Sequence, residues 1–386
     1  MTHAVVIVGA GPAGASAAVA LGQRGVQDVL LLDRAPFPRE KTCGSGLSPN
    51  AIALAEELGI GGELRRQAVQ IESVKIVTPG GRSMVLSSNA SAVILLRREF
   101  DNLLLERARA LGASFEGGVR ASALLREGGR VVGVRMADGR EIRARFVLCA
   151  DGAHSIFSTD PRPKRNISTL MGWWDGAEFV PGQIEMVFDR NLAPLYGWLF
   201  PEGGSRVNIG VCMDGQEEDG EKTGRNVRDV FARFLADHYE ARLRDATPVG
   251  KLKGHPIAYT TWVGHNTAPG ALYVGEAARV THNATGEGIS QAMQSGIYAA
   301  EAVSAVLAGR TNEAAAWRAY VWRHRKRFTA GFFAGHALRA VVRSPVLDGV
   351  AALYNHSAIR RNVVRVLGSA LAGASLRDRT HPITGR

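Results

Sequence analysis

The sequence predicts an α/β fold in which a doubly wound parallel sheet is interleaved with an antiparallel sheet and followed by a helical C-terminal region. Three observations lead to this prediction. Apolar strands alternate with helical segments at the start of the chain and again near its third quarter. Strands of alternating polarity fill the segments between them. From residue 317 onward the chain has the pattern of basic amphipathic helices.

A glycine-rich turn lies between the first predicted strand and the first predicted helix. The strand is the apolar run 4–8, the helix is the Ala-rich segment 13–25, and the turn is Gly9-Ala10-Gly11-Pro12-Ala13-Gly14. Gly9 permits the tight turn, Gly11 lets the backbone approach a pyrophosphate, and Gly14 lets the helix pack close to the strand. The N-terminus of the helix then faces the phosphates, so the turn predicts a dinucleotide site.

Further segments distinguish FAD from NAD. A second apolar strand, 29–32, ends at Asp33, at the distance from the glycines where a carboxylate binds the adenosine ribose. Ala150-Asp151-Gly152 follows another apolar strand, and Gly275-Glu276-Ala277-Ala278 precedes a second glycine cluster, Thr285-Gly286-Glu287-Gly288, that opens a helix. A simple NAD dehydrogenase has no need of these later segments. The set therefore predicts an FAD site, in which the helix N-terminus near Gly288 stabilises negative charge on the reduced flavin.

The chain resembles the FAD-dependent oxidoreductases of the para-hydroxybenzoate hydroxylase type, and among them most closely the geranylgeranyl reductase family. Arg97-x-x-Phe100-Asp101 is similar to the conserved arginine segment of that superfamily, Ala150 to Ser155 to its second nucleotide motif, and Gly275 to Ala278 to its third. Pro38-Arg39-Glu40-Lys41-Thr42-Cys43-Gly44-Ser45-Gly46-Leu47-Ser48 and Tyr196-Gly197-Trp198-Leu199-Phe200-Pro201 resemble two segments of geranylgeranyl reductases, the second of which lines the substrate cavity there. The pattern extends from residue 1 to about 310. The halogenase signature Trp-x-Trp-x-Ile-Pro is absent.

The motifs and the resemblance together imply a set of site residues. FAD contacts are expected from Gly9, Gly11, Ala13, Gly14, Asp33, Arg34, Cys43, Gly44, Arg97, Asp151, Gly275, Glu276, Gly286, Gly288 and Ile289. Substrate contacts are expected from Tyr196, Trp198 and Phe200, which alternate and so share one face of a strand. The catalytic candidates are Cys43 and His282, and Cys149 and Cys212 are expected to be core residues. No metal-ligand spacing is present.

Two positions depart from the family pattern. Glu276 stands where the family has an Asp that holds the ribityl chain, so this contact must shift or relocate. Asn283 stands where the family has a proline beside the reactive edge of the flavin. These departures keep open a third hypothesis, a flavin-binding protein at the membrane surface without turnover.

The positive charge is concentrated at the C-terminal end. Residues 317–386 contain thirteen Lys or Arg and two Asp, an excess equal to the net charge of the whole chain, +11. Predicted helices at 328–342 and 358–371 are interrupted at Pro345. Two interpretations remain open: peripheral contact with an anionic membrane surface, or a helical appendage docked on an acidic face of the nucleotide domain. Nucleic acid is not expected, because no binding motif accompanies the charge.

These features predict a cytoplasmic enzyme, either free or peripheral at the inner membrane surface. The chain starts without a signal peptide pattern, contains no apolar run long enough to span a bilayer, and has three scattered cysteines. The leading hypothesis is an FAD enzyme that reduces carbon-carbon double bonds of an isoprenoid or similarly apolar molecule. The alternative is a flavoprotein monooxygenase that hydroxylates an aromatic or polyketide-like secondary metabolite. NADPH would bind transiently, or a ferredoxin-like donor would replace it, because there is no second dinucleotide motif.

The order of motifs predicts interleaved domains. Residues 1–70, 98–164 and 266–312 are expected to form the Rossmann-like FAD-binding domain, and residues 71–97 and 165–265 the substrate domain. The basic helical region is expected at 313–386.

Overall fold

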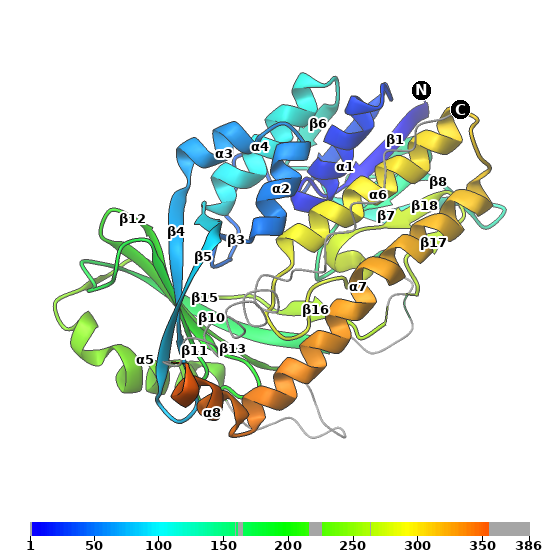
Figure 1. The fold of residues 1–386 in the computed structure, drawn as a ribbon. Helices are drawn as coiled ribbons and strands as arrows, with labels where there is room; N and C mark the ends of the chain where they lie inside the picture. Colours follow the sequence, from blue (N-terminus) through cyan, green and yellow to red (C-terminus); the bar gives the residue numbers. More distant parts are fainter. Residues whose placement is uncertain (1, 159, 161–164, 216–225, 263, 355–386) are drawn as a thin grey trace.

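Two β-sheets form the framework of the molecule (Figure 1). The computed structural model describes residues 2–158, 160, 165–215, 226–262 and 264–354. The predicted helix at 358–371 lies outside these residues. The α/β fold with a C-terminal helical region is confirmed. The residue limits proposed for the domains stay a prediction.

The first sheet is the doubly wound parallel sheet. Its central strands run in the order β18-β9-β1-β2-β6, with neighbours parallel, and β17, β8 and β7 extend it by antiparallel pairing. Its strands are β1 (Thr2–Val8), β2 (Val29–Asp33), β6 (Ser114–Gly117), β7 (Ala121–Glu127), β8 (Arg130–Met136), β9 (Glu141–Cys149), β17 (Thr267–Ala268) and β18 (Ala271–Tyr273). The apolar runs of β1 and β2 are buried on both faces, against helices on one side and mainly against β7 and β8 on the other.

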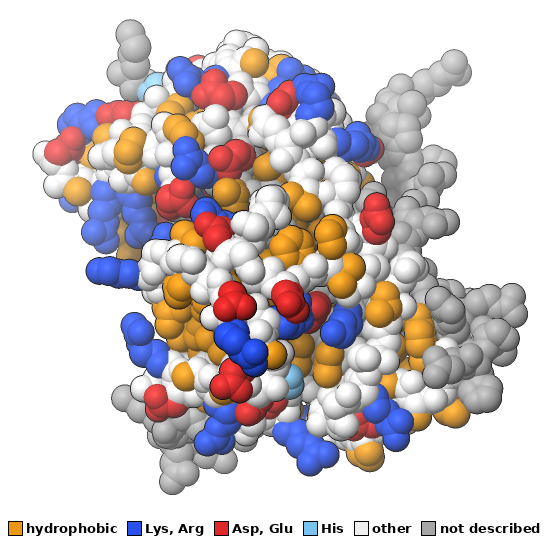
Figure 2. Space-filling model, turned by 90° about the vertical axis from the view of Figure 1, so that its left-hand side faces the viewer, with side chains coloured by type: hydrophobic (Ala, Val, Ile, Leu, Met, Phe, Trp, Pro, Cys, Tyr) orange, Lys and Arg blue, Asp and Glu red, His pale blue; other side chains and the backbone are white. Residues whose placement is uncertain are grey.

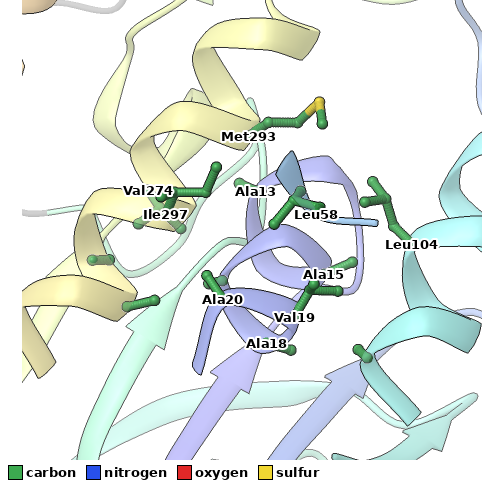
Figure 3. Close-up of a cluster of buried hydrophobic side chains, with 14 of the residues drawn as sticks. Ala13, Ala15, Ala18, Val19, Ala20, Leu58, Leu104, Val274, Met293 and Ile297 are labelled. Carbon is green, nitrogen blue, oxygen red and sulfur yellow. The ribbon is translucent and has the colours of Figure 1, made fainter. Parts of the chain in front are cut away.

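Helices α1 (Pro12–Gln23), α4 (Arg97–Ala110) and α6 (Ile289–Leu307) cover one face of this sheet (Figure 1). Small side chains on α1 allow close packing: Ala13, Ala15 and Ala18 point into the cluster that also holds Met293 and Ile297 of α6 (Figure 3). A Cβ at Gly296 would overlap the carbonyl oxygen of Ala13. The backbones of α1 and α6 therefore touch at this point, where only glycine fits.

The second sheet is mainly antiparallel and follows the order β14-β10-β13-β12-β11-β4-β5-β3, with β15 and β16 beside β10. Its strands are β3 (Gly46–Leu47), β4 (Val69–Val77), β5 (Ser83–Ile94), β10 (Arg165–Asp175), β11 (Gln183–Val187), β12 (Gly197–Gly203), β13 (Arg206–Asp214), β14 (Thr247–Pro248), β15 (Lys253–Gly254) and β16 (Ile257–Tyr259). The predicted antiparallel character needs one correction, since β11 pairs with β4 in parallel. The chain passes through the first sheet between these two strands, and such a long crossover permits parallel pairing.

The remaining helices close the faces and connect the sheets. α2 (Pro49–Glu57) and α3 (Gly61–Gln67) lie beside α4, and α5 (Val227–Leu243) covers one face of the second sheet with its buried aromatic side chains. A short 3-10 helix, η1 (Gly275–Ala278), follows β18. α7 (Glu313–Arg343) runs along both halves of the molecule and is followed by α8 (Val346–Leu353) (Figure 1).

α7 packs into the core of both halves. Trp317 and Tyr320 belong to the cluster around α1, Phe328 and Phe332 pack on the other face of the first sheet, and Val342 packs beneath the second. Ion pairs strengthen this docking: Arg323 meets Glu301, and Arg339 meets Asp214. In the described part of the basic region, one side of the helix is therefore docked on the rest of the molecule.

Candidate active site

The glycine-rich turn sits against the second nucleotide motif. Gly9 has φ +103°, and a Cβ there would overlap the carbonyl oxygen of Ala150. A Cβ at Gly14 would overlap the carbonyl oxygen of Gly9, which gives Gly14 the packing role expected of it. Along the Cβ direction of Gly11 the nearest atom is Nη2 of Arg39 at 3.4 Å, and Gly11 borders a cavity. The turn therefore leaves room at the N-terminus of α1 that an anionic group fits.

Asp33 ties the end of β2 to this turn. The backbone N–H of Ala10 donates to Oδ2 of Asp33 at 2.9 Å, and the N–H of Ala35 donates to Oδ1 at 3.0 Å. Asp33 is buried but borders the cavity. Its carboxylate is thus held at the carboxyl end of the strand, where a ribose hydroxyl is bound in sites of this type.

A buried carboxylate organises the arginines of the site. Arg97 donates from Nε and Nη2 to the two oxygens of Asp101, both at 2.7 Å, and Asp101 is fully buried. Nη2 of Arg39 lies 3.1 Å from the same carboxylate, and its Nε lies 3.7 Å from Asp33. The fork of Arg97 is fixed in orientation by this two-point contact. Arg39 and Arg97 therefore present fixed positive charge to the cavity they line.

One cavity of about 890 Å³ brings together most of the residues expected at the site. It is bordered by Gly9, Gly11, Ala13, Asp33, Arg34, Cys43, Gly44, Arg97, Asp151, Gly275, Glu276, Gly286, Gly288 and Ile289, and also by Tyr196, Trp198 and Phe200. Gly14 lies behind the turn, and His282 is not part of the lining. The cavity extends from the carboxyl ends of the first sheet to the inner face of the second, which is where ligands bind in open α/β sheets.

The wall formed by the second sheet is apolar. Its side chains come from six strands and the segment before β12: Ile71, Val74, Leu86, Met171, Ile184, Met186, Tyr196, Trp198, Phe200 and Cys212. Trp198 is held in place because its indole N–H donates to Oδ1 of Asn208 at 2.7 Å. Cys212 is a core residue as expected, but it also faces the cavity.

Cys43 lies between the polar and apolar parts of the cavity. It belongs to a loop that carries the cavity-lining residues 39–49. A Cβ at the adjacent Gly44 would lie 3.1 Å from the ring of Phe200 and 3.3 Å from the indole nitrogen of Trp198. The backbone N–H of Ser45 donates to the Cys43 sulfur at 3.3 Å. The backbone next to Cys43 thus lies against the aromatic wall, and the thiol itself interacts with Arg97.

Ionisable groups cluster beside Cys43. Burial lowers the pKa of Lys41 to about 8, although the attraction of Glu276 partly opposes the shift. Burial likewise raises the pKa of Glu276, and Lys41 and Arg97 oppose that rise. Burial, with Lys41 nearby, lowers the pKa of His255 to about 4, and the His255 ring contacts the ring of His154 at 5.4 Å between centroids. His255 is therefore neutral near pH 7.

Lys41, His255 and Glu287 were not singled out from the sequence as site residues. Lys41 does lie in the segment that resembles geranylgeranyl reductases, which is the signal that could have identified it. Glu287 accepts hydrogen bonds from Ser48 at 2.7 Å, from Ser290 at 2.5 Å and from Gln291 at 2.9 Å. This carboxylate joins the Cys43 loop to the first turn of α6.

Two residues of the 282–288 loop, His282 and Asn283, lie outside the lining of this cavity. His282 is buried and its Nδ1 lies 3.2 Å from the backbone nitrogen of Thr285, so its ring is engaged by its own loop and does not reach the cavity. Burial lowers its pKa to about 4. Asn283 is also outside the cavity lining: its Nδ2 donates to the carbonyl of Phe332 in α7 at 3.2 Å. The residue that replaces the family's proline thus helps to dock α7.

Charges of both signs are interspersed over the face of the molecule that carries β4, β12 and α5 (Figure 2). No helix formed by the described residues combines the length and the apolar character needed to cross a bilayer.

Comparisons with known proteins agree with this geometry. Residues 2–327 match the model of the FAD binding domain family. The chain is 32% identical to the menaquinone reductase of Mycobacterium tuberculosis over 77% of this chain and 75% of the relative. It is 31% identical to digeranylgeranylglycerophospholipid reductase 2 of Methanopyrus kandleri over 88% of this chain and 86% of the relative. Among solved structures, a geranylgeranyl bacteriochlorophyll reductase-like protein from Thermoplasma acidophilum superimposes with a TM-score of 0.82 at 22% identity, over 96% of this chain and 98% of that one.

Proposed function

The chain belongs to the FAD-binding domain family and is an FAD-dependent oxidoreductase, and from this premise we propose that it reduces carbon-carbon double bonds of an isoprenoid or similarly long apolar molecule. The observation that carries the proposal is the single cavity that joins the nucleotide-binding residues to an apolar wall. Two relatives named as reductases, of menaquinone and of a digeranylgeranyl lipid, support the same substrate class.

The polar part of the cavity fits FAD. Gly9 and Gly11 leave space at the N-terminus of α1, Asp33 is held at the end of β2, and Arg39 and Arg97 are fixed by Asp101. Bound FAD supplies two-electron redox chemistry. Glu276 stands where the family has an Asp. Its longer side chain lines the cavity and interacts electrostatically with Lys41. We infer that this interaction accommodates the replacement.

Cys43 is the proposed proton donor. Saturating a double bond requires one proton from the protein in addition to the electrons and hydrogen supplied by the cofactor. Tyr196 is poorly suited, because its O–H donates to the carbonyl of Thr285 at 2.5 Å and burial raises its pKa well above the ordinary value. His255 is neutral near pH 7, and His282 does not reach the cavity. Cys43 lines the cavity, and the adjacent backbone lies against the aromatic wall where an apolar chain would pack.

The test is reduction without oxygen. The purified holoenzyme, reduced chemically, is mixed anaerobically with a menaquinone or a geranylgeranyl compound, and the product is identified by mass spectrometry. The proposal predicts a product that gains two hydrogen atoms in its isoprenoid chain, a gain that for menaquinone persists after the quinone ring is reoxidised in air. A product that gains an oxygen atom, formed in air only, would support the monooxygenase alternative instead. Cys43→Ala should retain FAD and lose most of the turnover, and Cys149→Ala, in the core, serves as the thiol control.

The enzyme would meet such a substrate at a membrane, and α7 offers a surface for this contact. Trp322 and Phe333 on α7 are exposed, as is Trp262, on which Arg325 packs. From residue 314 to 347 the sequence contains no Asp or Glu. An acid-free, basic surface with exposed aromatic rings is suited to an anionic lipid surface. We propose peripheral membrane contact through this surface and the basic residues of 317–386.

Flotation with vesicles tests the contact. Because Trp317, Tyr320 and Phe328 belong to the core, deleting 317–386 would disrupt the fold, and surface variants are the sharper probe. Arg325→Glu with Lys326→Glu should abolish flotation with phosphatidylglycerol vesicles. The matched control Arg65→Glu with Arg66→Glu, on exposed α3, should leave it intact. Equal flotation of both double variants would refute membrane contact through α7.

A further inference from the structure

The apolar side chains on the floor of the cavity form rows that run across three neighbouring strands. β4 lies between β5 and β11, and the pairing register aligns their side chains. One row consists of Val74, Leu86 and Ile184. The next row consists of Ile76, Met84 and Met186. Residues two apart on a strand share a face, so both rows face the same side of the sheet, about 6.7 Å apart along the strands.

The cavity ends at the second row. All three side chains of the first row line it, but Met186 alone lines it from the second. Ile76 and Met84 are 1% and 2% exposed and are packed in the same cluster as side chains from α8 and the residue after it. These side chains are Leu347, Ala351 and Tyr354. This end of the cavity is therefore closed by the second row, and α8 packs in the same cluster as that row.

α8 is fixed to the hairpin that joins β4 and β5. Asp348 accepts hydrogen bonds from the Thr78 hydroxyl and from the backbone N–H of Gly80, the latter at 2.9 Å. The Tyr354 hydroxyl donates to the carbonyl of Val85 at 2.6 Å. Polar contacts thus hold α8 at both ends, while Leu347 and Ala351 pack between them toward the sheet.

We propose that α8 and Tyr354 support the second row, which ends the cavity, and thereby set the greatest length of apolar chain that the site accepts. The proposal deepens the proposed function and rests on it. The reacting bond lies near Cys43 in that function, so the distance from Cys43 to α8 limits how much of the chain can extend beyond the reacting bond. Leu347 and Ala351 are the specificity-determining positions.

Binding of saturated primary alcohols of increasing length tests the limit without turnover. Affinity for the FAD-loaded enzyme, measured by calorimetry, should rise about four-fold with each added methylene while the chain is still being buried. Beyond the length that reaches α8 the affinity should stop rising. We call the chain length at which the affinity stops rising the break. Leu347→Ala should move this break to longer alcohols, and Ala351→Leu should move it to shorter ones.

Leu353→Ala is the matched control, because Leu353 is on the same helix but 48% exposed. It should leave the break where the wild type has it. The proposal is overturned if folded Leu347→Ala and Ala351→Leu enzymes keep the wild-type break, if Leu353→Ala moves it equally, or if affinity shows no break. Should Leu347→Ala fail to fold, Ala351→Leu decides alone. If the break shifts as expected but the enzyme reduces no isoprenoid, the proposed function is refuted, while the role of α8 in limiting chain length is still supported.

Discussion

Replacing Asp101 with Asn removes a negative charge shared by two arginines. Asp101 is fully buried, receives two hydrogen bonds of 2.7 Å from Arg97, and lies 3.1 Å from Arg39. Arg39 retains Asp33 at 3.7 Å. Arg97, 9% exposed, would be left with the Asn amide in place of its carboxylate partner. The variant keeps the shape of the side chain, so its effect reports on charge.

The expected destabilisation is large. Removing one partner of a buried ion pair costs about 3–5 kcal/mol, because the remaining charge is not compensated. With an unfolding entropy of roughly 2.1 cal/mol/K per residue, this loss lowers the melting temperature of a chain of 386 residues by about 4–6 °C. FAD affinity should fall as well, because Arg39 and Arg97 line the cavity.

The assay is thermal unfolding of the FAD-free protein by calorimetry, which separates stability from cofactor binding. Glu106→Gln is the control, because Glu106 lies on the same helix and pairs with Arg109 at 3.1 Å with both side chains more than half exposed. An exposed pair of this kind contributes about 0–1 kcal/mol. Equal melting shifts in the two variants would show that Asp101 does not organise a buried charge network.

Two further predictions concern the polar part of the cavity. Gly9→Ala should abolish FAD retention on purification, because the added Cβ would overlap the carbonyl oxygen of Ala150. Gly25 also has a positive φ but no atom lies within 4 Å of its Cβ position, so Gly25→Ala should lower the free energy of unfolding by about 1–2 kcal/mol and retain FAD. A Gly9→Ala protein that is purified with yellow flavin would contradict this prediction. Burial lowers the pKa of Lys41 from 10.5 to about 8, so between these values the unfolded chain binds more protons and the contribution of Lys41 to stability rises with pH. The melting temperature of the FAD-free wild type should therefore rise relative to that of Lys41→Met between pH 8 and 10, and a constant difference over this range would sink the prediction.

The glycine turn and the strand ends could be predicted from the sequence because their geometry is local. Gly9, Gly11 and Gly14 act through backbone positions that the strand-turn-helix pattern fixes. Asp33 follows directly from the end of a buried strand. The alternation of Tyr196, Trp198 and Phe200 likewise gives a shared face that the cavity borders.

Positions that depend on distant packing could not be predicted in this way. The direction of the His282 side chain is set by its contacts within a folded loop, and a sequence pattern does not encode it. The core role of α7 depends on three separate clusters, one on each face of the first sheet and one at the second sheet. The parallel pairing of β11 with β4 joins residues more than a hundred positions apart. Lys41 and Glu276 interact only because η1 and the Cys43 loop meet in the cavity.

The absorption spectrum of the purified protein tests the whole interpretation most directly. The protein should carry FAD, seen as a yellow flavin spectrum that chemical reduction bleaches and that anaerobic addition of a long-chain isoprenoid restores. A folded protein that remains colourless after incubation with FAD would contradict the assignment of the cavity. A flavin spectrum that no isoprenoid restores would contradict the proposed reaction.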